Sequence, residues 1–384
     1  MPTRTYMVID ARRDHSIRIP RPEPSVKLGV PNACNGCHRE KSAAWAARTV
    51  AKWYGHAPVG FQRFAEALQA GSAGAPGAQK ALAQLIADRE QPPIARASAL
   101  ALMARYSGPL AAAVVRESVS DVSPLVRRAA ARALSNNDSR TSIGTLAPLL
   151  RDRVRAVRIE AAEVLAGTPT DVMPGGEVAA LKRATDEYVA AQVLNAERPE
   201  AHLDLALLFA KEKRFAEAKS ELTIALSLDP SFAPAAVNLA DLDRELGHEA
   251  DGERVLRDAI ARSPDDASLQ HALGLLLVRQ GYRQEALDRL AAAARLDPAN
   301  ARFVYVYAIA LGDAGRTDRA LDVLQDNIAG HPYDRDSLAA LANLYGSSGN
   351  PRKAVVYAKR LADLEPHDAQ VRQLIIRLKA AAQH

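Results

Sequence analysis

Cysteine is almost absent from this chain of 384 residues, which contains only Cys34 and Cys37. A structural zinc centre usually needs two such pairs, and a disulfide closing so small a loop would be strained. No βαβ pattern surrounds the pair, which disfavours a thioredoxin-like redox site. Neither a nucleophile–base constellation nor a glycine-rich phosphate loop is present, so the sequence does not favour a hydrolase or a phosphate-binding enzyme.

Long apolar runs are also missing. No stretch of 18 apolar residues occurs, so we predict no membrane span. The first residues hold no apolar core of signal-peptide length, and the chain as written would stay in the cytoplasm if Met1 is the genuine start. Aromatic residues make up only 5% and do not interleave with the arginines, so we expect no nucleic-acid partner.

The two cysteines form a C-x-x-C-H motif with His38. Two thiols on either side of a short turn can add to the two vinyl groups of one porphyrin, and the adjacent histidine then supplies an axial nitrogen. We therefore predict covalently bound haem c on Cys34 and Cys37, with its iron held by His38. The other axial ligand is predicted to be His15, in a basic, proline-rich segment that would wrap over the haem; a solvated loop is the alternative. His56 is a second candidate.

Short motifs flank the cysteines on both sides. They are Arg4 to Ser16 (RTYMVIDARRDHS), Arg18 to Pro22 (RIPRP), Pro31 to His38 (PNACNGCH), Lys41 to Trp45 (KSAAW) and Trp53 to Gly55 (WYG). Residues 1–56 thereby resemble bacterial multihaem c-type cytochromes with C-terminal helical repeats. The resemblance implies several haem motifs, of which this chain has one, and a histidine after an aspartate, here His15, that ligates a neighbouring iron.

The same resemblance bears on the compartment. Haem attachment of this kind occurs outside the cytoplasm, so it implies that the intact protein is periplasmic. The missing export signal and missing haem motifs lead to the hypothesis that this chain is an N-terminally truncated product. In-frame C-x-x-C-H codons upstream of Met1 would support that hypothesis, and their absence would refute it.

A short helical repeat follows in residues 57–168, which we call the first array. An arginine recurs with a period of 31 residues, as Arg96, Arg127 and Arg158, and Asp121 and Asp152 lead two of the units. The pattern resembles HEAT-type repeats, with a shorter period than usual. We expect each arginine to bond locally to an acidic residue or a loop carbonyl of a neighbouring repeat. Binding of an acidic partner is the alternative.

A strict period of 34 residues marks residues 199–366, the second array, after a linker and lead-in helix in residues 169–198. The residues that recur with this period are five prolines and four glycines, namely Pro230, Pro264, Pro298, Pro332 and Pro366, with Gly247, Gly281, Gly315 and Gly349. This is the period of tetratricopeptide repeats (TPRs), in which glycine marks the turn inside a repeat and proline follows its second helix. Five units exceed the number needed for a stable stack, and residues 367–384 are expected to cap it.

These patterns predict an all-α solenoid with an irregular N-terminal haem-binding segment. The inner face of the second array is expected to contain chemically mixed residues, namely Val237, Asp241, Arg244, His271, Tyr305 and Asn343. We predict an electron-transfer protein whose repeats dock protein partners, including a redox partner. The alternatives are a non-redox scaffold with a vestigial haem motif, and part of a multihaem oxidoreductase or a haem enzyme with an open iron site.

Overall fold

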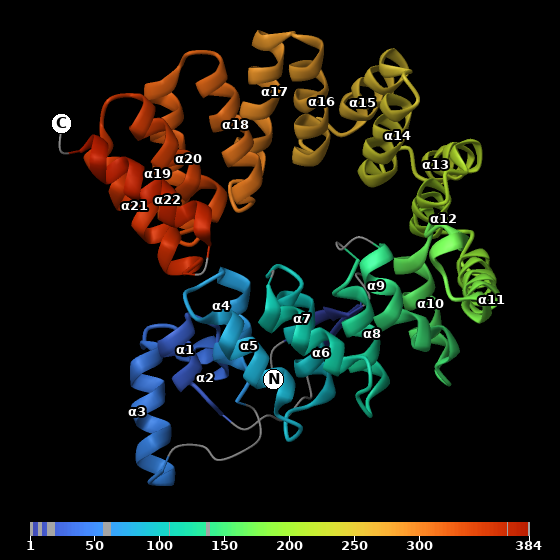
Figure 1. Cartoon of the computed structure of the whole chain (residues 1–384). Coiled ribbons are helices and arrows are strands. Elements are labelled where there is room, and N and C mark those ends of the chain that lie inside the picture. The colour runs from blue at the N-terminus through green and yellow to red at the C-terminus, as the bar shows by residue number, and fades with distance from the viewer. Residues whose placement is uncertain are drawn as a thin grey trace.

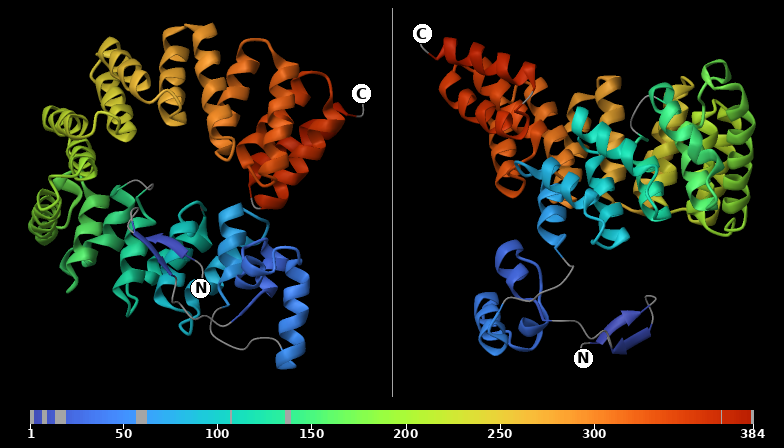
Figure 2. Two further views of the ribbon diagram at one scale, coloured as in Figure 1. Left: turned by 180° about the vertical axis from the view of Figure 1, so that it is seen from behind. Right: turned by 60° about the horizontal axis from the view of Figure 1, so that its bottom comes forward.

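A computed structural model describes residues 3–6, 10–13, 20–56, 63–106, 108–135, 139–366 and 368–382. Nearly all of its regular structure is helical, so the predicted all-α solenoid is confirmed. The helices follow one another around a ring, and the last ones return to the beginning of the first array (Figure 1). Two further views show the same closed course (Figure 2).

The N-terminal segment contains one structure that the sequence did not predict. Strands β1 (Thr3–Tyr6) and β2 (Asp10–Arg13) pair antiparallel, with Thr3 opposite Arg13. Three helices follow: α1 (Glu23–Leu28), α2 (Ala33–Cys37) and α3 (Ala43–Tyr54). Helix α3 buries Ala46 and Val50. Trp53, near the C-terminal end of α3, is 71% exposed.

The first array packs short helices around two apolar clusters. Its helices are α4 (Ala65–Ala73), α5 (Ala78–Ala87), α6 (Pro93–Met103), α7 (Pro109–Ser118), α8 (Pro124–Arg132), α9 (Ser139–Leu146), the 3₁₀ turn η1 (Ala147–Arg151) and α10 (Arg155–Leu165). The 3₁₀ turn η2 (Thr170–Val172) and the long helix α11 (Gly175–Val193) lead to the second array.

Five helix pairs and a capping helix make up the second array. They are α12 (Pro199–Lys211) with α13 (Phe215–Leu228), α14 (Ala233–Glu245) with α15 (Glu249–Arg262), α16 (Ala267–Gln280) with α17 (Arg283–Leu296), α18 (Ala301–Asp313) with α19 (Thr317–Gly330), α20 (Arg335–Ser347) with α21 (Pro351–Leu364), and the cap α22 (Ala369–Ala381).

The predicted positions of the recurring glycines and prolines in the second array are confirmed. The four period glycines lie between the helices of a pair with φ between 74° and 83°, a left-handed conformation that glycine adopts at little cost. In the first repeat Lys213 takes this place with φ 60°. Each period proline lies two residues beyond a second helix. The small second-helix residues Ala218, Ala286, Ala320 and Ala354 are all buried, so paired helices approach closely.

Candidate functional site

The predicted haem motif lies on a single helical turn. Helix α2 begins after Asn32, whose side chain accepts a hydrogen bond from the Asn35 N–H at 3.1 Å. Cys34 and Cys37 are three residues apart, so both thiols lie on one face of this turn. Both are free thiols, Cys37 is exposed and Cys34 is half-buried. The turn therefore presents two free thiols on the same side.

Side-chain amides hold this turn against its neighbours. Asn35 donates through Nδ2 to the carbonyls of His38 and Lys41, at 3.2 and 2.6 Å. Asn32 donates through Nδ2 to Asn35 Oδ1 at 2.7 Å and to the Oγ of Ser25, a buried residue of α1, at 3.0 Å. The conformation of the cysteine turn is thus fixed by the protein's own hydrogen bonds.

His38 ends α2, and its ring lies against Trp45 of α3, with the ring centroids 5.0 Å apart. The ring is exposed, and no hydrogen bond joins it to another residue in the described part of the chain. Its nitrogens are therefore free to bind a metal. Two thiols on one face and an accessible imidazole directly after them fit the attachment chemistry of haem c. Among the described residues, no group of three or more His, Cys, Asp or Glu gathers as a metal-ion cage would require.

Of the two candidates for the second axial ligand, the structure describes only His56. His15 lies outside the described residues, so its role stays a prediction. His56 follows the C-cap Gly55 of α3, whereas Trp45, which contacts His38, lies in the first turn of that helix. Eleven residues at helical rise separate Trp45 from His56 by about 16 Å. This separation argues against His38 and His56 binding one iron.

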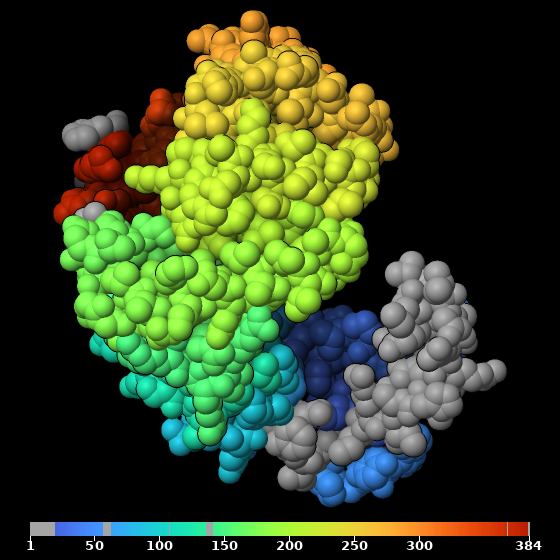
Figure 3. All heavy atoms as spheres, turned by 90° about the vertical axis from the view of Figure 1, so that its right-hand side faces the viewer, coloured from blue at the N-terminus to red at the C-terminus, as the bar shows by residue number. Residues whose placement is uncertain are grey.

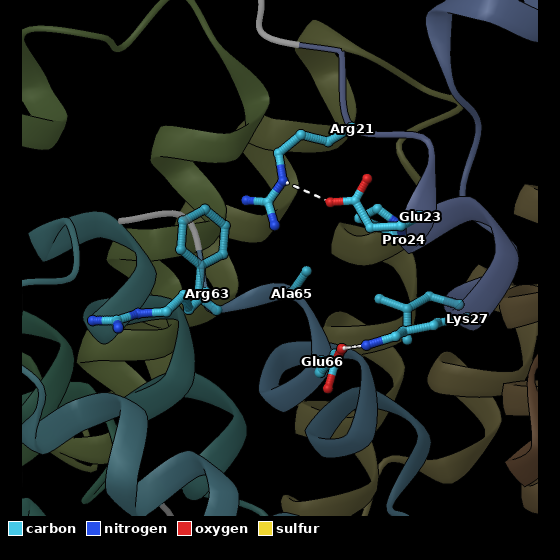
Figure 4. A pocket seen from close by; sticks show the side chains of 9 residues that line it. Arg21, Glu23, Pro24, Lys27, Arg63, Ala65 and Glu66 are labelled. Carbon is cyan, nitrogen blue, oxygen red and sulfur yellow. Dashed lines mark hydrogen bonds and ion pairs between the residues drawn. The ribbon is translucent and has the colours of Figure 1, made fainter. Parts of the chain in front are cut away.

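A pocket of about 340 Å³ joins the N-terminal segment to the first array, between α1 and α4 (Figure 4). Its charged side chains are paired: Arg21 with Glu23 at 3.1 Å, Lys27 with Glu66 at 2.8 Å, and Arg63 with Glu90 at 2.9 Å. Since these charges neutralise one another, the pocket offers no strong attraction to a charged ligand.

The recurring arginines of the first array bond locally, as predicted. Arg96 donates to the Ile86 carbonyl at 2.7 Å and to Asp121 at 2.5 Å. Arg127 holds Asp152 through two hydrogen bonds of 2.7 and 2.9 Å and also donates to the Asp121 carbonyl. Arg158 repeats the arrangement with the Asp152 carbonyl and with Glu187 of α11.

These arginines are therefore structural ties that link successive repeats. Their guanidinium groups are already bound to carboxylates and carbonyls, which leaves them unable to attract an acidic partner.

The second array contains a pocket of about 230 Å³ between its helices α14, α16 and α18. Val237, Asp241 and His271, three of the residues predicted to face inward, line it together with Phe303. The His271 and Phe303 rings lie 4.6 Å apart, and His271 Nδ1 is buried without a hydrogen-bond partner. Burial lowers the pKa of His271, and the charge of Arg302 lowers it further, so the ring is neutral at pH 7.

The other predicted inward residues lie elsewhere. Arg244 and Asn343 are exposed outside this pocket, and half-buried Tyr305 packs against the last apolar cluster. The 34-residue period made Tyr305 the counterpart of His271, and sequence reasoning therefore missed Phe303, two positions earlier. Its only signal was the dense aromatic and β-branched stretch from Phe303 to Tyr307.

A family model described as "Tetratricopeptide repeat" matches residues 188–367. The second array is a TPR array. The match excludes residues 1–187, so it bears neither on the cysteine turn nor on the first array. No curated protein matches this chain.

Several solved structures are similar to part of the chain. YrrB, titled "a TPR protein with an unusual peptide-binding site", is 20% identical over 50% of this chain and 97% of its own, with a TM-score of 0.38. PilF from Pseudomonas aeruginosa is 22% identical over 48% and 84%, with a TM-score of 0.42. A thermophilic TPR protein from Thermus thermophilus is 23% identical over 48% and 100%, with a TM-score of 0.36.

In the TPR array, helices α14, α16 and α18 are the first helices of three consecutive repeats. The pocket of His271 and Phe303 therefore lies on the surface that these first helices form together, which we call the TPR groove. None of the helices in the described part of the chain combines the length and the apolar character needed to cross a bilayer.

Proposed function

We propose that the chain is a docking scaffold whose TPR groove binds a segment of a partner protein. The observation that carries the proposal is the buried, unpaired Nδ1 of His271 beside Phe303 in the 230 Å³ pocket. An unpaired buried polar atom costs free energy, which a ligand regains by hydrogen bonding to it. The largely apolar wall and this unpaired polar atom suit an apolar side chain next to a peptide N–H or C=O. A buried cationic clamp for a C-terminal carboxylate is not present in this pocket.

Affinity capture with the purified chain, followed by titration of the captured partner, tests the docking function. His271→Ala and Phe303→Ala are expected to weaken binding tenfold or more, about 1.4 kcal/mol or more. Asn343→Ala changes an exposed residue outside the pocket and is expected to leave affinity unchanged. Equal affinities for all three variants, with unchanged circular dichroism, would place the partner elsewhere.

A second function is favoured by the cysteine turn. We propose that Cys34 and Cys37 carry covalent haem c, that His38 and His15 bind its iron, and that the loaded protein transfers electrons to a redox partner in the periplasm. In the attachment step each S–H adds across a vinyl C=C, forming one C–S and one C–H bond, so no oxidant is consumed. The support is the pair of free thiols on one face of α2 and the unpaired His38 ring.

Expression with an export signal and the haem-maturation machinery tests this second function. A Soret band that survives acid–acetone extraction, with the mass of the chain raised by one haem, is expected. Cys34→Ala/Cys37→Ala should lose both. His15→Ala should convert a low-spin iron to high-spin, whereas His56→Ala should not. An extractable haem in the wild-type chain would leave the scaffold as its only function.

A further inference from the structure

The two ends of the solenoid meet on the side of the ring opposite the linker (Figures 1 and 2). The loop between α19 and α20 lies against the turn after α4 and the end of α6. The Arg335 guanidinium lies 5.4 Å from the centre of the Tyr106 ring. A Cβ placed on Gly74 would lie 3.9 Å from Tyr333 Cβ and 3.7 Å from the Tyr333 carbonyl oxygen. Residues near Gly74 and Tyr106 therefore lie directly beside the loop before α20, close enough that one added methyl group on Gly74 would reach Tyr333.

This contact is narrow and poorly filled. A cavity of about 440 Å³ lies within it, lined on one side by Arg105 and Tyr106 and on the other by residues 330–336. The Tyr106 hydroxyl is buried without a hydrogen-bond partner. Arg105 donates to the Ser72 carbonyl of its own array, and Arg335 pairs with Glu365 of its own array. Arg105 and Arg335 therefore form their hydrogen bonds and ion pairs within their own arrays and not across the contact.

The apolar clusters lead to the same conclusion. Among the described residues, the apolar cluster on the first-array side includes no residue beyond Leu134, and the cluster on the other side includes none before Tyr305. Neither cluster therefore contains a residue from across the contact. Burial of apolar surface supplies most of the stability of a helix–helix junction. A contact without its own apolar cluster is therefore the weakest link in the ring.

The other junction between the arrays is firm. Ile159 and Ala166 of the first array pack into the apolar cluster of α12 and α13. Gly167 lies so close to the end of α12 that an added Cβ would be 2.0 Å from the Lys211 carbonyl oxygen. Viewed from this side, the first array and the first TPRs form one continuous wall of packed atoms (Figure 3). The ring is thus held permanently on one side.

We infer that the loop Gly330–Asp334 together with Arg335 is a releasable clasp, which docks on Ser72–Gly74 and Tyr106 of the same chain. Release opens the ring into an arc, while the junction at Gly167 keeps the arrays together. The clasp and the TPR groove belong to the same rigid array, so opening widens the approach to the groove without rebuilding it. This inference stands on the contact itself and does not depend on the haem or on the identity of a docking partner.

Paired cysteines test closure directly. The variant Gly74→Cys/Tyr333→Cys, made in a Cys34→Ala/Cys37→Ala background, places its Cβ atoms at the separation typical of disulfides. Mild oxidation is expected to cross-link most molecules within the chain, seen as faster migration on a non-reducing gel. Gly144→Cys/Tyr333→Cys is the control, since Gly144 lies on α9, far around the ring, and should remain reduced. A folded Gly74→Cys/Tyr333→Cys variant that stays reduced would overturn the inference.

Release is tested with the same reduced variant and a bulky maleimide. Tyr333 is exposed in the closed ring, so the thiol that reports release is the one at the half-buried position 74. Its labelling is expected to compete with cross-linking, because the clasp opens. Adding Arg335→Ala should speed labelling about two- to fivefold, the effect of removing one cation–π contact. The radius of gyration from small-angle scattering should rise with Arg335→Ala and return on cross-linking. Complete protection of the thiol at position 74, unaffected by Arg335→Ala, would show a fixed contact and refute release.

Discussion

At the scale of single residues, the stability of the first array depends on Arg96, Arg127 and Arg158 with their bound carboxylates, which we call the arginine ladder. The side chains of Arg127 and Asp152 are only 9% and 8% exposed, and three further hydrogen-bond acceptors or donors complete the pair. Arg127→Ala leaves a buried carboxylate without its partner, so we expect a loss of about 3–5 kcal/mol in the free energy of unfolding. Lys182→Ala removes only an exposed ion pair with Asp186 and should cost less than about 0.5 kcal/mol. Urea unfolding of both variants measures the difference, and equal losses would contradict it.

The carboxylates of the ladder also predict how stability depends on pH. Burial alone would raise the pKa of Asp121 and Asp152, but hydrogen bonds and charge from Arg96 and Arg127, with backbone N–H groups, outweigh it and lower both pKa values. A lowered folded pKa contributes stability that is present above the unfolded pKa of about 3.9 and lost as pH falls through the folded value.

We therefore expect the melting temperature to fall as the pH drops below about 4. The variant Asp121→Asn/Asp152→Asn should start from a lower melting temperature and show a flatter decline. Thermal unfolding between pH 7 and pH 2 checks this, and parallel curves for the two proteins would refute the assignment.

Some features of the candidate sites could be predicted from the sequence, and others could not. The C-x-x-C-H spacing predicted a short turn between the two thiols, and α2 is such a turn, with both cysteines on one face. The local role of the arginines was predicted because a charge that recurs at the repeat period must meet the same surroundings in each repeat. Phe303 could not be predicted, since its contact with His271 depends on how far α18 is rotated against α16. The haem and the ligand role of His15 stay predictions.

At the scale of elements, periodic sequence predicted structure well and aperiodic sequence did not. Proline and glycine act through the backbone itself, so a 34-residue period in both fixes helix ends and turns wherever it occurs. The first repeat departs at Lys213, where a side chain adopts the left-handed conformation usually left to glycine. Strands β1 and β2 were missed because four residues each are too few for an alternating pattern to be recognised.

Gly252 shows how packing overrides helix propensity. It occupies the position of the buried alanines in the other second helices, yet an added Cβ would lie 2.9 Å from the Ala240 carbonyl oxygen. We expect Gly252→Ala to destabilise the chain by about 1–2 kcal/mol, because crowding between α14 and α15 exceeds the gain in propensity. Gly144→Ala, in an exposed helical position with open space around it, should stabilise by about 0.5–1 kcal/mol. Chemical denaturation gives both signs, and a stabilising Gly252→Ala would show that α15 can shift.

At the scale of the whole molecule, the closure of the solenoid into a ring could not be predicted from the sequence. The curvature of a repeat protein accumulates from small rotations between neighbouring repeats, and no motif encodes their sum. The two arrays have different periods, so their relative direction depends on the junction between α10 and α12. At this junction Gly167 allows the end of α12 to pack against the first array, because any side chain at that position would collide with the Lys211 carbonyl oxygen.

Gly167→Ala should therefore open the ring at the far side. The new Cβ must move away from Lys211, which turns the TPR array about the junction, and a small rotation there becomes a large displacement at the clasp. Gly247→Ala is the matched control, since it has nearly the same φ, 78° against 74°, and nothing within 4 Å of its added Cβ. Both substitutions carry the same backbone strain of about 1–2 kcal/mol. Only Gly167→Ala should also lower the yield of the Gly74→Cys/Tyr333→Cys cross-link severalfold. Equal yields in the two backgrounds would mean that the direction of the TPR array is set by the apolar cluster of α12 and α13 rather than by this contact.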